Sequence, residues 1–443
     1  MLKKLLVVFL IAISLSATAQ KTISGTFTPA DAYNFGILYM IDVNNVFYKV
    51  DSQIKDGVFS VKTKEDMEPG MYRLVYDLPQ NEHFFDFIYS GKEDIEFTFS
   101  SEMGVSFLAS EENRLWYTYK RTVDSYLELA DASYTEGATK KEQKEFFHEQ
   151  SETLKKLENE AKGTVAETFI RAYKPYIPSK FETAETYTSH RRKNYWKTVD
   201  FGSELLQKSG LPLEMSLKYI FNFVEDSDQP EASRKHNVDM LAKTIVNQSP
   251  LFQKALLTDL WQFMVNNEQI EIANYLSEEH LIGIAEAQQD AALSQKLRIF
   301  KNTSIGALAP NFFWEEDIDG KTVNTNLHAL DDAENYLIIF WSSLCSHCLS
   351  EVPKIHAALK NSAPGKFHVI AVGLEDEPYD WQNRILDMPN FSHVLGLGKW
   401  DNKIGDDYDV SATPTYYLLD TDKHISAKPE TLEELMQLIA EDK

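Results

Sequence analysis

The chain has 443 residues, which is longer than one ordinary domain and predicts two or three. With 43% hydrophobic and 12% aromatic residues, its composition is typical of a folded protein. Its formal net charge of −24 would repel a phosphate backbone, so the predicted partners exclude nucleic acid.

The first residues have the pattern of a secretory signal peptide. Lys3 and Lys4 form a basic start, residues 5–17 form an apolar run too short for a membrane span, and Ala17-Thr18-Ala19 is a small-x-small cleavage site. We therefore expect residues 1–19 to be removed. The mature chain is expected in the periplasm or cell envelope, with no transmembrane segment.

Residues 20–105 predict an all-β domain. Short apolar or alternating runs recur about every ten residues, and turn signals such as Asp56-Gly57, Pro69-Gly70 and Ser90-Gly91 separate several of them. This spacing is typical of a β-sandwich.

Residues 106–300 predict an all-α domain. Apolar residues recur at helical spacing, for example at Leu256, Leu260 and Phe263. Prolines, among them Pro212, Pro230 and Pro250, divide the segment into six to eight expected helices. No function can be assigned to this segment from the sequence.

Residues 301–443 predict an α/β domain. Buried strands are expected at 336–341 and 367–372, a helix at 379–386, and a hairpin from 416–419 with 424–427. Thr431 and Glu434 have the spacing of a capping box that opens a final amphipathic helix.

The only two cysteines of the chain, Cys345 and Cys348, lie directly after the first of these strands. After them the apolar residues recur at three- and four-residue steps, so the pair opens a helix. Unpaired N–H groups and the positive end of the helix dipole favour the thiolate there. A disulfide that spans two residues adds little stability, so the pattern favours redox exchange.

The strand, the Cys-Ser-His-Cys motif and the helix together resemble the active site of thioredoxin. They are most similar to exported oxidoreductases of the TlpA/ResA type. Trp341 precedes the pair by four residues, Glu351 and Pro353 follow it, and Thr413-Pro414 resembles the family's cis-proline loop. Residues 20–105 also resemble a β-domain found in exported thioredoxin-like proteins of Gram-negative bacteria.

The resemblance implies an exported thiol-disulfide oxidoreductase with a C-terminal thioredoxin fold at 301–443. Cys345 would be the nucleophile, Cys348 the resolving thiol, and Glu351 the group that manages the proton of Cys348. Trp341, Thr413 and Pro414 would contact substrate. No metal or organic cofactor is implied, and the partners would be protein disulfides or dithiols and an envelope redox donor or acceptor.

Two further positions bear on the chemistry. His347 could lower the pKa of Cys345 as an imidazolium and make the pair more oxidising, whereas the resemblance implies reduction, as in cytochrome c maturation. Ile339 stands where thioredoxin has a buried acid, and Leu344 where a tryptophan commonly precedes the first cysteine. Glu351 would then carry more of the proton path.

Other functions remain open at this point. The chain could be a non-catalytic binding or scaffold protein with a vestigial redox domain. It could also be a peroxiredoxin-like peroxidase, because Ser342-x-x-Cys345 matches part of such a site, although Ile338 replaces the expected proline. A structural zinc site would need four ligands, and only two cysteines are present.

Overall fold

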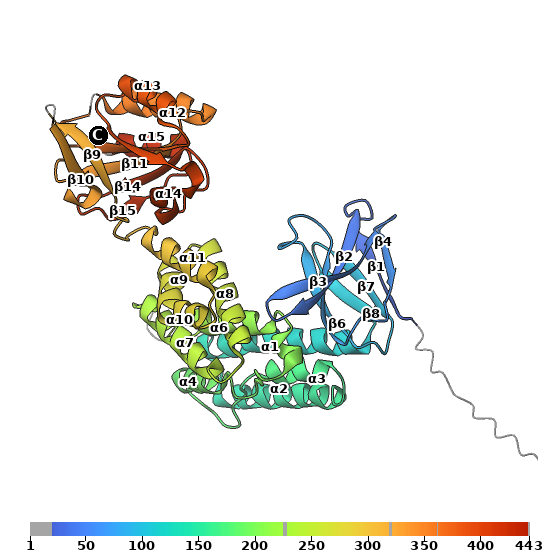
Figure 1. Cartoon of the computed structure of the whole chain (residues 1–443). Helices are drawn as coiled ribbons and strands as arrows, with labels where there is room; N and C mark the ends of the chain where they lie inside the picture. Colours follow the sequence, from blue (N-terminus) through green and yellow to red (C-terminus); the bar gives the residue numbers. More distant parts are fainter. Residues whose placement is uncertain (1–19, 225–227, 319–320, 361, 442–443) are drawn as a thin grey trace, which may run out of the picture. The chain divides into compact units, whose positions relative to one another are not determined.

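The computed structural model describes residues 20–224, 228–318, 321–360 and 362–441. The predicted signal peptide, residues 1–19, lies outside the described residues. The chain divides into two compact units, Met1–Phe263 and Met264–Lys443. Figure 1 shows the elements of both units, coloured along the sequence.

The first unit begins with two four-stranded β-sheets. Their orders are β4-β1-β7-β8 and β3-β2-β5-β6. Phe27, Phe59 and Phe97 of the first sheet share one buried apolar cluster with Leu38 and Phe87 of the second, as expected of a sandwich. The strands are β1 (Thr22–Thr28), β2 (Phe35–Asp42), β3 (Asn45–Gln53), β4 (Val58–Lys62), β5 (Gly70–Val75), β6 (Phe84–Tyr89), β7 (Ile95–Ser100) and β8 (Gly104–Ala109).

Helices follow the sandwich and pack on it. The Ser110 side chain caps the first helix, and the Asn113 side chain bonds both backbone groups of Ile88 in β6, at 2.7 and 2.8 Å. This buried amide ties the first helix to the edge of the sandwich. The helices are α1 (Glu111–Thr135), α2 (Lys140–Glu160), α3 (Ala166–Ala172), α4 (Ala184–Asn194), α5 (Glu204–Gln207), α6 (Leu211–Asn222), α7 (Pro230–Ile245) and α8 (Pro250–Asn266).

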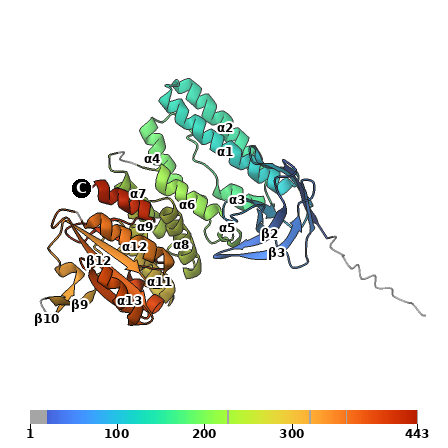
Figure 2. The ribbon, with the colours of Figure 1, turned by 90° about the horizontal axis from the view of Figure 1, so that it is seen from above.

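The helices α1 and α2 lie side by side, as Figure 1 and Figure 2 both show. Prolines occupy the first turn of α6, α7 and α8, where the missing N–H has no helical partner to lose. The division between α1 and α2 uses Gly137 instead, whose φ is 76°. The predicted number of helices was therefore too low, because the prediction relied on proline alone.

The second unit starts with three more helices and a turn of π-helix, followed by the α/β domain. The described residues 111–302 thus hold eleven α-helices. The additional elements are α9 (Ile270–Leu276), a π-helix (Ser277–Leu281), α10 (Ile282–Ala287) and α11 (Ala291–Asn302). In the described residues, no helix combines the length and apolar character that a membrane span requires.

The α/β domain is built on a five-stranded sheet of order β13-β12-β11-β14-β15. β11, β12 and β13 are parallel, and β14 and β15 are antiparallel to their neighbours. A separate hairpin of β9 and β10 precedes the sheet in the chain. The strands are β9 (Phe313–Ile318), β10 (Lys321–Asn326), β11 (Asn335–Trp341), β12 (Phe367–Glu375), β13 (Ser392–Leu397), β14 (Thr415–Leu419) and β15 (Ile425–Ala427).

The central strand β11 is buried on both faces, as its apolar run predicts. Ile338 and Phe340 belong to one apolar cluster, and Leu337 and Ile339 to another on the opposite face. The helices of the domain are α12 (Ser346–Leu359), α13 (Pro378–Arg384), α14 (Lys403–Asp407) and α15 (Leu432–Glu441). The predicted fold class, a β-sandwich followed by helices and a C-terminal thioredoxin-like α/β domain, is confirmed.

The last helix differs in one detail from its predicted start. Thr431 Oγ1 accepts from the Glu434 N–H at 3.2 Å, as a capping box requires. The Glu434 carboxylate, however, accepts from the Glu430 N–H at 2.9 Å and not from Thr431. The reciprocal bond is therefore shifted by one residue.

Candidate functional site

The two cysteines lie where β11 ends and α12 begins. Cys345 is the N-cap of α12 and has extended backbone angles. Its Sγ accepts a hydrogen bond from the Cys348 N–H at 3.3 Å. Cys345 is half-buried and Cys348 is fully buried, and both are free thiols. A sulfur at an N-cap accepts a hydrogen bond from a backbone N–H that has no partner within the helix. This bond favours the thiolate form of the cysteine.

The surroundings separate the pKa values of the two thiols. Burial alone would raise the pKa of Cys345, but hydrogen bonds from Cys348, Thr413 and the His347 backbone N–H outweigh it and lower this pKa. Burial, together with the hydrogen bond to Cys345, raises the pKa of Cys348 to about 12. Near neutral pH, Cys345 is therefore the thiol that ionises more readily.

The loop before β14 lies against the cysteine pair, although it is 68 residues further along the chain. The Thr413–Pro414 peptide bond is cis, and the Thr413 carbonyl oxygen lies 3.3 Å from Cys345 Sγ. The structure therefore brings together Thr413, Pro414 and Cys345, which the sequence analysis singled out separately.

Glu351 lies one turn beyond Cys348 on the same face of α12. Its Oε2 accepts a hydrogen bond from the Tyr416 hydroxyl at 2.7 Å. Tyr416 is 2% exposed and packs in the same apolar cluster as Cys348. This tyrosine was not among the site residues predicted from the sequence. Its position two residues after Pro414 was the available signal, but the strand register is needed to see what it faces.

Two predicted site residues lie differently from the expectation. Trp341 is 1% exposed and packs in the core with Cys348, so its ring offers no surface to a protein substrate, whereas Leu344 is 67% exposed beside Cys345. His347 is exposed, and it contributes to the lowered pKa of Cys345 through its backbone N–H. Among the hydrogen bonds of the described residues, none joins its imidazole to either sulfur.

A buried acid that sequence analysis missed fixes the turn before the pair. Glu375, at the end of β12, is 2% exposed and accepts hydrogen bonds from the Ser343 N–H and, at 3.3 Å, from the Ser342 hydroxyl. The Ser342 carbonyl in turn accepts from the Cys345 N–H at 3.1 Å. Glu375 thus holds the backbone that leads into the N-cap, and its only sequence signal is an acid at the end of a buried strand.

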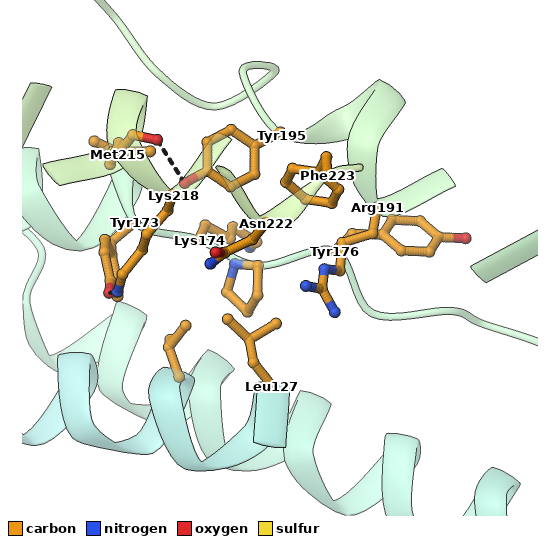
Figure 3. Close-up of a pocket in the computed structure, with 13 residues that line it drawn as sticks. Leu127, Tyr173, Lys174, Tyr176, Arg191, Tyr195, Met215, Lys218, Asn222 and Phe223 are labelled. Carbon is orange, nitrogen blue, oxygen red and sulfur yellow. Dashed lines mark hydrogen bonds between the residues drawn. The ribbon is translucent and has the colours of Figure 1, made fainter. Parts of the chain in front are cut away.

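A hollow of about 580 Å³, partly open to solvent, lies among the helices of the first unit (Figure 3). It is lined by the rings of Tyr173, Tyr176, Tyr195 and Phe223. The three tyrosine hydroxyls of its wall have partners: Tyr173 donates to Asp124, Tyr176 to Glu182, and Tyr195 to the Met215 carbonyl, as Figure 3 marks for Tyr195.

The three cations of that wall are also paired with carboxylates. Lys174 pairs with Glu158 at 2.6 Å, Arg191 with Asp131 at 2.8 Å, and Lys218 with Asp124 at 3.2 Å. Because these charges are compensated, the wall does not select one class of ligand, and the thiol pair remains the candidate site.

In the comparison with known proteins, the segment of the chain that matches a family model contains both cysteines. Residues 334–425 match a family model described as thioredoxin-like. No curated protein matches the chain. The C-terminal domain is therefore thioredoxin-like, while the match leaves most of the chain outside it.

Three solved structures illustrate the similarity. The thioredoxin domain of a thiol-disulfide oxidoreductase from Bacteroides vulgatus is 25% identical, covers 31% of this chain and 96% of its own, and has a TM-score of 0.27. A domain of a possible thiol-disulfide isomerase from Cytophaga hutchinsonii is 27% identical, with 31% and 92% covered and a TM-score of 0.27. A thioredoxin-like protein from Bacteroides caccae is 20% identical, with 61% and 98% covered and a TM-score of 0.37.

Proposed function

We propose that the chain is a thiol-disulfide oxidoreductase that exchanges disulfides with protein substrates through Cys345 and Cys348. The observation that carries the proposal is the asymmetry of the pair. Cys345 is accessible and has a lowered pKa, whereas Cys348 is buried and has a pKa raised to about 12. One thiol is thus suited to attack a substrate, and the other to remain protonated until the mixed disulfide forms.

The exchange proceeds in two steps. The Cys345 thiolate attacks a substrate disulfide, forms a mixed disulfide and releases the first substrate sulfur as a thiolate. Cys348 then loses its proton to Glu351 and attacks Cys345 Sγ. The second substrate sulfur leaves as a thiolate, and a disulfide joins Cys345 to Cys348. The substrate gains two electrons and, in total, two protons, and the dithiol of the chain is oxidised.

We further propose that Thr413 and Pro414 bind the substrate. The Thr413 carbonyl lies 3.3 Å from Cys345 Sγ, so a backbone segment docked on this loop would hold its sulfur beside the nucleophile. Leu344, exposed next to Cys345, would supply apolar contact in place of the buried Trp341.

The direction that we propose is reduction of the substrate, as the similarity to TlpA/ResA-type proteins implies for cytochrome c maturation. An imidazolium beside Cys345 would favour the opposite direction. The His347 group that contributes to the lowered pKa of Cys345 is its backbone N–H, and among the hydrogen bonds of the described residues none joins its imidazole to Cys345. The compartment that we propose is the cell envelope, from the signal-like sequence of residues 1–19 alone. Fractionation of cells that express the full chain would test it, and recovery of all the protein in the cytoplasm would contradict it.

The activity itself is tested with the reduced full chain and a peptide bridged by one disulfide, labelled so that its reduction is fluorescent. We expect a rate well above that of an equal concentration of dithiothreitol. Cys345→Ser should abolish turnover, and Cys348→Ser should accumulate a mixed disulfide. A scaffold with a vestigial redox domain would not exceed free dithiothreitol, and a peroxidase would instead consume hydrogen peroxide.

A further inference from the structure

The resolving step needs a base that the thiols do not supply. Cys348 is fully buried, and burial is the main reason why its pKa rises to about 12. Near neutral pH its sulfur is therefore protonated, and attack on the mixed disulfide requires removal of that proton. Glu351, three residues further on the same helix face, is the carboxylate positioned to take it.

A carboxylate on a flexible side chain is an efficient base only when it is held in place. The bond that holds Glu351 comes from another element: the Tyr416 hydroxyl donates to Oε2 at 2.7 Å. Tyr416 is 2% exposed, so its ring is fixed by packing and its hydroxyl has a defined position. This bond engages Oε2 and not Oε1.

The sheet register explains why the tyrosine occurs here. Tyr416 of β14 lies directly opposite Ile339 of β11, and the two share one face of the sheet and one apolar cluster with Cys348. Ile339 has no group that could handle a proton. On this face, the hydroxyl of the neighbouring strand and the carboxylate of the helix together provide the polar group that Ile339 lacks.

We propose that Tyr416 is a positioning residue of the resolving step: it orients Glu351 so that Oε1 accepts the proton of Cys348. The proposal rests on the proposed function and adds a residue to it. β14 follows directly from the Thr413–Pro414 loop, so one segment carries both the loop beside Cys345 and the hydroxyl that holds the base.

The hydroxyl acts as a permanent donor and does not itself transfer the proton. Burial, and then the hydrogen bond to Glu351, raise the pKa of Tyr416 far above the range in which exchange takes place. Tyr416 therefore keeps its proton, and the proton of Cys348 passes to Glu351 and from there to solvent.

The experiment separates the two steps in the full chain. Reduced protein is mixed with the bridged peptide, samples are quenched in acid, and the mixed disulfide and the final disulfide are quantified by mass. For Tyr416→Phe we expect an unchanged rate of mixed-disulfide formation and resolution slower by about tenfold. For Glu351→Gln we expect about 10²-fold slower resolution, at the lower end of what a general base contributes.

The matched control is Tyr417→Phe. Tyr417 is the next residue of β14, is also 2% exposed, and donates its hydroxyl to the Tyr408 carbonyl on the opposite face. Because both substitutions remove one buried hydroxyl from the same strand, a general effect on the fold would appear in both. Only Tyr416→Phe should slow resolution.

Two readouts test whether Tyr416 acts through Glu351. The double variant Tyr416→Phe/Glu351→Gln should resolve no slower than Glu351→Gln alone, within about twofold, since residues that act as one unit are not additive. Without an internal base, the Cys348 thiolate fraction rises about tenfold per pH unit below its pKa. The rate of resolution in Glu351→Gln should therefore depend steeply on pH. The pH dependence of this rate in Tyr416→Phe should lie between that of Glu351→Gln and that of the native chain.

The outcomes distinguish the inference from the function on which it rests. If the native chain does not reduce the peptide faster than dithiothreitol, the proposed function fails. If the native chain is active and Tyr416→Phe resolves as fast as Tyr417→Phe, the role of Tyr416 is overturned. Equal slowing of both steps, or additive effects in the double variant, would also overturn it, because the effect would then not act through the base.

Discussion

The two faces of the C-terminal sheet both contain buried tyrosines, but these tyrosines have different kinds of partners. On one face, Tyr417 donates to the Tyr408 carbonyl and Tyr408 donates to the Pro310 carbonyl. On the other face, Tyr416 donates to a carboxylate next to a buried thiol. A buried hydroxyl needs an acceptor in either case, so burial alone does not mark a functional residue. What distinguishes Tyr416 is that its acceptor is a titratable carboxylate.

Tyr416 thus bonds to a group whose charge can change, whereas Tyr417 and Tyr408 on the opposite face bond to backbone carbonyls. We expect changes on the face of Tyr416 to alter rates and pH dependence, and changes on the opposite face to alter stability alone.

The largest effect concerns alkylation of the two thiols by iodoacetamide. With a pKa of about 12, only about one Cys348 in 10⁵ is a thiolate at pH 7, whereas the pKa of Cys345 is lowered. We expect Cys345 to react at least about 10³-fold faster than Cys348 in the reduced full chain, as measured by peptide mass mapping over time. Comparable rates would overturn the assignment of nucleophile and resolving thiol.

The second effect is a loss of stability of the reduced chain at alkaline pH. The folded pKa of Cys348 lies above its unfolded value of about 8.5, so the unfolded state releases its proton first as pH rises. The contribution of Cys348 is therefore constant below about pH 8.5 and becomes unfavourable above it, by up to about 2 kcal/mol at pH 10.

Denaturant midpoints at pH 8 and pH 10 measure this effect, with Cys348→Ser as the matched variant. The native reduced chain should lose more stability between the two pH values than Cys348→Ser does. An equal loss would mean that Cys348 is not the buried thiol of the folded state. The lowered pKa of Cys345 acts in the opposite direction, because it favours the folded state above its unfolded pKa, and Cys348→Ser retains the backbone N–H that contributes to it.

Much of this site could be predicted from local sequence, and the remainder could not for a physical reason. An apolar run, a C-x-x-C pair and a helical repeat are adjacent in the chain, so β11 and the start of α12 followed from spacing. Tyr416 and Glu375 act through partners 65 and 32 residues away. Only the strand register and the helix position bring these pairs together, and no local pattern encodes that.

The edge strand β13 was missed for a related reason. It is short and contains His393 and Gly396, so it lacks the continuous apolar run that predicted β11 and β12. For His347 the sequence predicted a contact that is not among the hydrogen bonds of the described residues. Its place between the cysteines suggested that its charge acts on Cys345, but sequence adjacency does not fix where an exposed side chain points.

The third effect concerns Glu375. Glu375→Ala removes the acceptor of the Ser343 N–H and leaves a buried donor unpaired, which costs about 1–3 kcal/mol. Because this bond holds the turn before Cys345, we expect disulfide exchange about tenfold slower and a lower denaturant midpoint. Glu375→Gln keeps an acceptor oxygen and should retain most of the activity. If Glu375→Ala lost stability but exchanged disulfides at the native rate, Glu375 would have no part in positioning the site.

The smallest effect concerns His347, and two substitutions separate its imidazole from its backbone. His347→Gln removes the imidazole and keeps the N–H that lowers the pKa of Cys345, so the reduction potential should change by less than about 10 mV. His347→Pro removes that N–H at the first turn of α12, where proline is tolerated. Loss of a donor to the thiolate destabilises the reduced form, so the potential should fall by about 30 mV, which for two electrons is ~1.4 kcal/mol. Equilibration with glutathione buffers followed by thiol trapping measures both variants. A fall of equal size in His347→Gln would restore the imidazolium to the site and favour the oxidising direction.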